Sequence, residues 1–146
     1  MSGDFLGTFE NSCNKDRVVI PAPFKAKFSA AAKQTVLCTI GPDNDSIAIY
    51  PLDNWFKLQD KLKNGSDDDK DLLDKLMFYA SHEQVLEGPG RIRITNKLQK
   101  IGNIRDKVVI QGFGSYMLLW DEERFDKISE KNLTEKNNYS SRNYQI

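Results

Sequence analysis

The sequence lacks the features that would place it in a membrane, in a disulfide framework or around a metal ion. Its 146 residues contain no run of 18 or more apolar residues, and the N-terminal residues show no basic region followed by an apolar stretch. Cys13 and Cys38 are too few for a disulfide framework, and His82 offers no recognised zinc spacing with them. We therefore expect a cytoplasmic protein without a membrane segment, a metal or another cofactor.

Net charge is also missing, because 21 Lys and Arg residues balance 21 Asp and Glu residues. The cations are nevertheless concentrated in two stretches of the chain. Residues 11–35 carry five cationic side chains and one acid, and residues 88–107 carry six cations and one acid. A clustered excess of Lys and Arg is the electrostatic signature of a surface that binds a polyanion.

The two cationic stretches repeat one pattern, and the copies lie about 74 residues apart. Arg17-Val18-Val19-Ile20 follows a turn-forming segment in the first copy, and Arg91-Ile92-Arg93-Ile94 does so in the second. Each copy has only roughly 60 residues, which are too few to bury a stable core alone. The copies are therefore expected to share a core with each other or with other subunits.

Short β-branched runs and amphipathic segments predict an α+β protein that is mainly β. Strands are expected at residues 5–10, 17–20, 36–40, 46–50, 91–94, 108–111 and 116–120. Helices are expected at 24–32, from Asp53 to 63, from Ser66 to 78, near Lys97 and from Asp121, with Asp53 and Ser66 as caps. The predicted domains are a first repeat at 5–63, a connecting helix at 64–78, a second repeat at 79–130 and a disordered tail at 131–146.

Arg17 and Arg91 are the leading candidate site residues, because each lies between a tight turn and a short strand of its copy. An arginine in that place can form bidentate hydrogen bonds with guanine or with phosphate. The candidate DNA-binding set adds cations that would hold phosphates, namely Lys15, Lys25, Arg93 and Lys97. The alternative is a pair of solvated turn cations. The repetition brings the functional interpretation level with it, since a symmetric site needs matched groups.

Catalysis is the weakest of the function classes, and no enzyme is predicted. Cys13 lies near Lys15 and Arg17, which would favour its thiolate, yet no motif supplies a general base with an orienting partner. Gly112-Phe113-Gly114 reads as a hairpin turn rather than a nucleotide cradle, and the aspartates at 67–71 lack the spacing of a calcium loop. We expect no small-molecule substrate.

Two segments resemble motifs of the MraZ family. Lys15 to Lys25 is similar to the first motif, Asp-x-Lys-Gly-Arg-x-x-Ile-Pro-x-x-Phe-Arg, and Glu87 to Ile94 is similar to the second. The resemblance covers residues 5–128 and implies a bacterial transcriptional regulator with two pseudo-symmetric AbrB-like swapped-hairpin β-barrel half-domains and short flanking helices. It also implies a nucleoid-associated, homo-oligomeric ring that binds double-stranded DNA at promoter direct repeats upstream of the division and cell-wall gene cluster.

The first copy departs from the family pattern at two positions. The family has a carboxylate four residues before the arginine, and Glu87 takes that place in the second copy. In the first copy Cys13 stands there instead, and Asp16 replaces the turn glycine. We therefore expect Arg91 to be the better positioned reader, and Cys13→Asp with Asp16→Gly to strengthen DNA binding. The alternative function is an AbrB-type antitoxin or scaffold whose basic turns bind an acidic protein partner.

Overall fold

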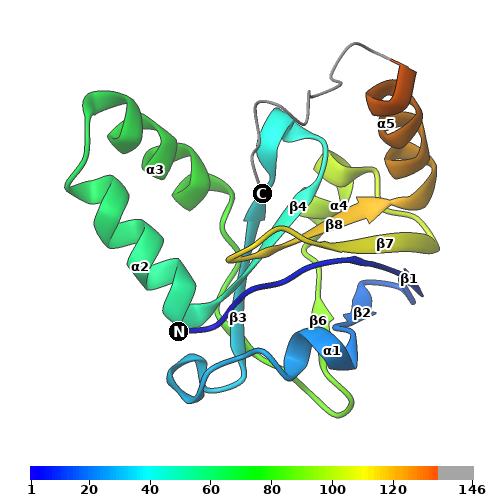
Figure 1. The fold of residues 1–146 in the computed structure, drawn as a ribbon, viewed down its shortest axis with the longest axis horizontal. Helices are drawn as coiled ribbons and strands as arrows, with labels where there is room; N and C mark the ends of the chain where they lie inside the picture. Colours follow the sequence, from blue (N-terminus) through cyan, green and yellow to red (C-terminus); the bar gives the residue numbers. More distant parts are fainter. Residues whose placement is uncertain (135–146) are drawn as a thin grey trace, which may run out of the picture.

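The computed structural model describes residues 1–134 and builds them around two antiparallel sheets (Figure 1). The large sheet has the strand order β1-β7-β8-β4-β3-β5. Its strands are β1 (Thr8–Ser12), β3 (Thr35–Ile40), β4 (Ile47–Pro51), β5 (Gln84–Val85), β7 (Lys107–Gly112) and β8 (Met117–Asp121). The small sheet pairs β2 (Arg17–Val19) with β6 (Arg91–Arg93).

Five α-helices complete the described chain, and together with the two sheets they confirm the predicted α+β class. They are α1 (Ala22–Lys25), α2 (Leu52–Lys63), α3 (Asp67–Tyr79), α4 (Asn96–Gly102) and α5 (Glu122–Thr134), with short 3₁₀ turns at Ala30–Ala32 and Pro42–Asn44. Helices α2 and α3 lie side by side at one end of the large sheet, and α5 lies at the other end (Figure 1). None of the helices within residues 1–134 has the length and apolar character needed to cross a membrane.

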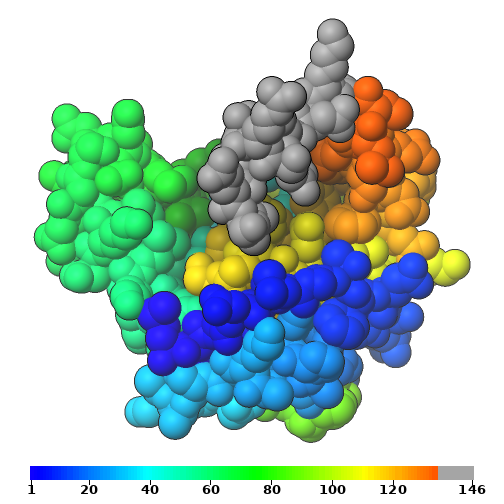
Figure 2. Space-filling view, in the orientation of Figure 1, coloured from blue at the N-terminus to red at the C-terminus, as the bar shows by residue number. Residues whose placement is uncertain are grey.

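The order of elements repeats along the chain, and the two copies exchange strands. Strand β1 of the first copy pairs with β7 of the second, and β5 of the second copy pairs with β3 of the first. The large sheet is symmetric about the pair Ala48–Leu118, and the small sheet about Val18–Ile92. Figure 2 shows the result on the surface, where blue residues of the first copy form a band against yellow residues of the second.

One hydrophobic core is shared between the copies, as the sequence led us to expect. It contains Val18, Ile20 and Phe24 from the first copy together with Ile92, Ile94 and Leu98 from the second. All six side chains are almost completely buried, and they lie between the small sheet and one face of the large sheet. Because alternate residues of a strand point to opposite faces, the other face of the large sheet forms a second cluster under α2, α3 and α5.

Phe24 is the centre of an aromatic group in the shared core. Its ring lies 5.7 Å from that of Phe5 and 5.0 Å from that of Phe9, both edge to face, and Phe28 contacts Phe5 in the same way. Edge-to-face contacts of this kind contribute beyond the burial of apolar area. The segment after β2 is thereby fixed to strand β1 and to the chain that leads into it.

The predicted helix at 24–32 was wrong, because tertiary contacts override the helix propensity of its Ala and Lys residues. Helix α1 ends at Lys25, and the backbone at Ser29 is extended. The Ser29 hydroxyl donates to Asp53 Oδ2 at 2.7 Å, and the Ser29 amide donates to the Ser2 hydroxyl. Asp53 was predicted to cap α2, but its side chain does not do so. It accepts hydrogen bonds from Ser2 and Ser29 instead.

Ser66 does cap α3, and Asp69 completes a capping box. The Ser66 hydroxyl accepts from the Asp69 amide at 3.2 Å, and the Asp69 carboxylate accepts from the Ser66 amide at 3.1 Å. Helix α5 continues to Thr134, so the first residues of the predicted tail at 131–146 are helical. The rest of that predicted tail, residues 135–146, lies outside the described residues.

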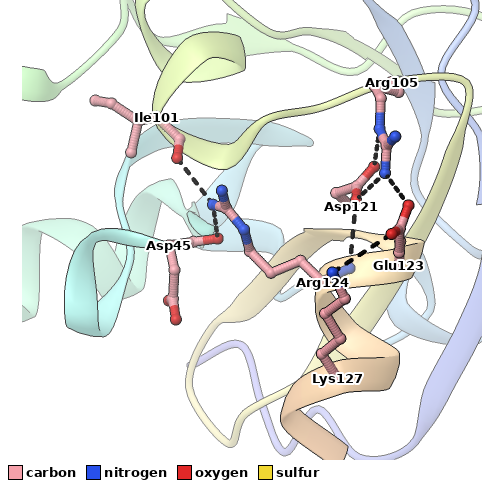
Figure 3. Close-up of polar contacts among 7 residues, drawn as sticks. All are labelled: Asp45, Ile101, Arg105, Asp121, Glu123, Arg124 and Lys127. Carbon is pink, nitrogen blue, oxygen red and sulfur yellow. Dashed lines mark hydrogen bonds and ion pairs between the residues drawn. The ribbon is translucent and has the colours of Figure 1, made fainter.

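Buried Asp121 anchors the start of α5 (Figure 3). Arg105 donates to both carboxylate oxygens, at 3.1 and 2.8 Å, and the Arg124 amide donates to Oδ2 at 3.3 Å. The Arg124 guanidinium reaches the carbonyls of Asp45 and Ile101. Burial alone would raise the pKa of Asp121, but the hydrogen bonds from Arg105 and Arg124 outweigh it and lower that pKa.

Asp121→Asn is expected to lower the free energy of unfolding at neutral pH and to leave it almost unchanged in acid. Since the pKa of Asp121 is lowered by folding, its stabilisation is present above about pH 4 and is lost as the pH falls through the lowered value. Urea titrations of both proteins at about pH 7 and about pH 3 measure the difference. The control Glu123→Gln changes an exposed carboxylate on the same arginine and should have little effect. An Asp121→Asn loss of the same size at both pH values would contradict the prediction.

Candidate nucleic-acid interface

The small sheet presents a cationic outer face. In the antiparallel register Arg17 lies opposite Arg93, Val18 opposite Ile92, and Val19 opposite Arg91. The central pair Val18–Ile92 is buried in the shared core, so the flanking residues point the other way. We call the side chains of Arg17, Val19, Arg91 and Arg93 the outer face.

Two turns lead into the small sheet, and they differ in length. In the first copy the Arg17 amide donates to the Asn14 carbonyl at 3.1 Å, and Lys15 adopts a left-handed φ of 63°. In the second copy the Arg91 amide donates to the Glu87 carbonyl at 2.7 Å, across a turn with one more residue. Gly88 and Gly90 supply the positive φ values there, at 51° and 111°. Each turn places its arginine at the first position of a strand.

Arg17 and Arg93 form a like-charge pair directly across the small sheet. Residues opposite each other in an antiparallel pair have Cβ atoms about 5 Å apart, and like charges at that separation destabilise the pairing. Within residues 1–134, the one ion pair that involves the outer face joins Arg17 Nε to Asp16 Oδ1 at 4.0 Å, and both side chains are exposed. The outer face therefore carries positive charge that the described chain does not neutralise.

A polar depression lies beside this face, with a volume of about 370 Å³. The predicted site residues Lys15, Arg17 and Arg91 line it, and the structure therefore brings these three together. The other lining residues are Asn11, Ser12, Asn14 and Val19. A depression with cations and neutral hydrogen-bonding groups is suited to an anionic oxygen such as that of a phosphate.

Lys25 and Lys97, which the sequence placed in the same set, have protein partners. Lys25 Nζ donates to the Pro89 carbonyl, and its side chain lies against Gly90, so it supports the turn of the second copy. Lys97 Nζ lies 4.2 Å from the ring centroid of Phe78 at the end of α3. Their roles in phosphate binding remain predictions.

Two amide side chains that the sequence analysis missed hold the small sheet against the large one. Asn11 of β1 donates through Nδ2 to the Val19 carbonyl at 2.8 Å. Gln84 of β5 donates through Nε2 to the Arg93 carbonyl at 2.9 Å and accepts from the Arg93 amide at 2.8 Å. The two amides take equivalent places in the repeat, but the one-residue difference between the turns hides this equivalence in the sequence.

The structure corrects the predicted match between Cys13 and Glu87. The Cys13 amide donates to the Asp106 carbonyl before β7, whereas the Leu86 amide makes the same bond to Gln34 before β3. Cys13 is therefore equivalent to Leu86, because the first turn is one residue shorter. Burial, with Asp16 and Asp106 nearby, raises the pKa of the Cys13 thiol, which is the opposite of what a thiolate nucleophile needs.

Cys13→Asp is consequently expected to destabilise the protein and not to strengthen DNA binding. A carboxylate at this buried position would lose hydration without gaining a partner, at a cost of roughly 1 to 3 kcal/mol in the free energy of unfolding. Thermal unfolding of the variant measures the loss. Asn14→Asp, which places the carboxylate at the position equivalent to Glu87, is the control and should have little effect. Unchanged stability of Cys13→Asp would refute the structural match.

The fold and the outer face define a class, a two-copy protein whose small sheet exposes a cationic pair of strands. A family model described as "MraZ protein, putative antitoxin-like" matches residues 77–144. The chain is 27% identical over 132 residues to the transcriptional regulator MraZ of Clostridium tetani, covering 88% of this chain and 89% of that protein. It is also 27% identical to the MraZ regulators of Shewanella sediminis, over 83% of this chain and 81% of that protein, and Shewanella oneidensis, over 77% and 76%. The chain is thus similar to MraZ proteins over most of its length.

Proposed function

We propose that this protein is a sequence-specific DNA-binding transcriptional regulator without an enzymatic step. The observation that carries the proposal is the exposed pair Arg17–Arg93, two like charges held opposite each other. The acid next to them, Asp16, lies 4.0 Å from Arg17. A polyanion relieves this repulsion when it binds, so the outer face favours a DNA backbone over neutral partners. The names of its relatives, which are transcriptional regulators, support the same conclusion.

The geometry of the small sheet indicates which side chains would contact bases and which would contact phosphates. A two-stranded β-ribbon fits the major groove, where arginine forms bidentate hydrogen bonds with guanine. Arg17 and Arg91, at the strand ends next to the turns, would contact base edges, while Lys15 and Arg93 would hold phosphates. Lys25 and Lys97 would add phosphate contacts at the margins.

The proposed targets are promoter direct repeats upstream of the division and cell-wall gene cluster, with the protein associated with the nucleoid in the cytoplasm.

We further propose that the protein repeats at 5–63 and 79–130 have an AbrB-like swapped-hairpin arrangement, and that the chains form a homo-oligomeric ring. In a ring several subunits engage successive repeats, and modest affinity per subunit becomes strong avidity. Light scattering at micromolar concentration tests the ring, and a monomer alone would exclude it.

A titration with DNA tests the proposed function. The protein is mixed with a duplex from the region upstream of its own gene and with a scrambled duplex of equal length, at two salt concentrations. We expect a clear preference for the natural duplex and a steep loss of affinity with salt, because bound cations release counterions from the phosphates. Equal affinity for both duplexes would reject sequence-specific binding.

A second candidate, an antitoxin or scaffold that binds an acidic protein partner, is favoured by the antitoxin-like description of the matching family model. Both candidates use the same cationic outer face, so they differ in the partner and not in the surface. The same titration separates them, since a protein-binding module should show no preference between the natural and scrambled duplexes.

A further inference from the structure

The outer face has an internal two-fold symmetry that is broken at one position. The register of the small sheet is symmetric about Val18–Ile92, so Arg17 is equivalent to Arg91. By the same symmetry Val19 is equivalent to Arg93. The first strand therefore offers one arginine and one valine, and the second strand offers two arginines. The ends of the face differ as well, because Arg93 lies beside Arg17 whereas Arg91 lies beside Val19.

The contacts beneath the face differ in the same sense. Gln84 makes two hydrogen bonds to the main chain of Arg93, one to its amide and one to its carbonyl. Asn11 makes a single bond to the carbonyl of Val19, and its own oxygen accepts from the Ser12 amide. The main chain at the additional arginine is thus held more firmly than its counterpart. A firmly held main chain fixes the point from which the side chain extends, so less freedom is lost on binding and ligands are discriminated better.

We infer that Arg93, held by Gln84 and opposed in the symmetry by Val19, gives the protein a direction on DNA. DNA itself has local two-fold symmetry, so a symmetric pair of strands would read two equivalent halves of an element. With the additional arginine at one end, one chain reads an asymmetric element. In this inference Arg93 adds a contact with a base edge to the phosphate role proposed above. The half of the element next to Arg17 and Arg93 therefore tolerates base changes less than the half next to Arg91. This inference rests on the proposed function and specifies the kind of DNA element that the same site takes.

A base-substitution scan tests the direction. The probe is a duplex with one segment of the upstream region that the wild-type protein protects, and each base pair is changed in turn. For the wild type we expect about a hundredfold weaker binding for changes in one half and about tenfold for changes in the other, which has a single base-contacting arginine. Val19→Arg adds the missing arginine to the first strand, and Arg93→Val removes the additional one from the second. Each variant should therefore abolish the excess sensitivity of the more sensitive half.

Val85→Arg is the matched control, because Val85 is an exposed valine in β5 that is not part of the outer face. It adds the same charge and should keep the wild-type asymmetry. If Val19→Arg does not fold, as judged by circular dichroism, Arg93→Val decides alone. Wild-type protein that binds the natural and scrambled duplexes equally would reject the proposed function. Three results would overturn the inference and leave that function intact: specific binding with equal halves in the wild type, the wild-type excess retained in folded Val19→Arg and Arg93→Val, or loss of that excess in Val85→Arg.

Discussion

Arg91→Ala is expected to weaken sequence-specific DNA binding by about 1 to 3 kcal/mol per engaged site, the usual worth of a bidentate contact with a base. Arg91 begins β6 directly after a turn that is closed by backbone hydrogen bonds from Gly90 and Arg91 to the Glu87 carbonyl. Fluorescence anisotropy with the natural and scrambled duplexes measures the loss, which should fall on the natural duplex. In a ring the loss is multiplied over the engaged subunits.

Arg17→Ala should cost less than Arg91→Ala, because Asp16 lies 4.0 Å from the Arg17 guanidinium and partly offsets its charge. Lys63→Ala removes an exposed cation at the end of α2 and serves as the control for charge alone. Its effect should be small and the same for both duplexes. A larger loss for Arg17→Ala than for Arg91→Ala would make the first turn the principal reader.

Phe24→Ala is expected to lower the free energy of unfolding by about 3 to 5 kcal/mol, as is usual when a fully buried phenylalanine is truncated. Phe24 is 1% exposed and contacts Phe5 and Phe9 edge to face. It also lies in the core directly beneath the small sheet, so its loss should loosen the outer face as well. Urea unfolding measures the change, and the midpoint should fall without a large change in slope.

Phe56→Ala is the matched control, because Phe56 is 52% exposed on α2. Removing a half-exposed ring leaves no cavity in the core, and we expect a change within about 0.5 kcal/mol. If both variants lost the same stability, the shared core would not depend on Phe24 as the structure indicates.

Strands β2 and β6 and the equivalent arginines that begin them could be predicted because their signals are local, whereas β5 was not predicted. A β-branched run after a turn marks β2 and β6, and its repetition at a fixed spacing identifies Arg17 and Arg91 as equivalent. The capping box at Ser66 and Asp69 is also local, since both partners lie within one turn of helix. Each motif on which these predictions depend consists of residues close together in the sequence.

The errors arose where distant parts of the chain determine the local structure. The helix predicted at 24–32 ends early because Ser29 bonds to Ser2 and Asp53. Cys13 was matched to Glu87 instead of Leu86 because the two turns differ in length by one residue. Residue spacing alone does not reveal this difference. The contacts of Gln84 with Arg93 required the knowledge that β5 lies at an edge of the large sheet next to β6.

The exchange of strands between the copies bears on how the chain folds while it is being synthesised. Strand β1 is made early, but its partner β7 begins only at Lys107, and Thr8 must wait to pair with Gln111. Until then the ribosome carries a nascent chain with unpaired strand edges and half of a core, which are features that chaperones bind and that promote aggregation. Translation that stops after α2 should therefore yield a product for degradation rather than a stable half-protein, and the cell obtains either the whole cationic surface or none of it.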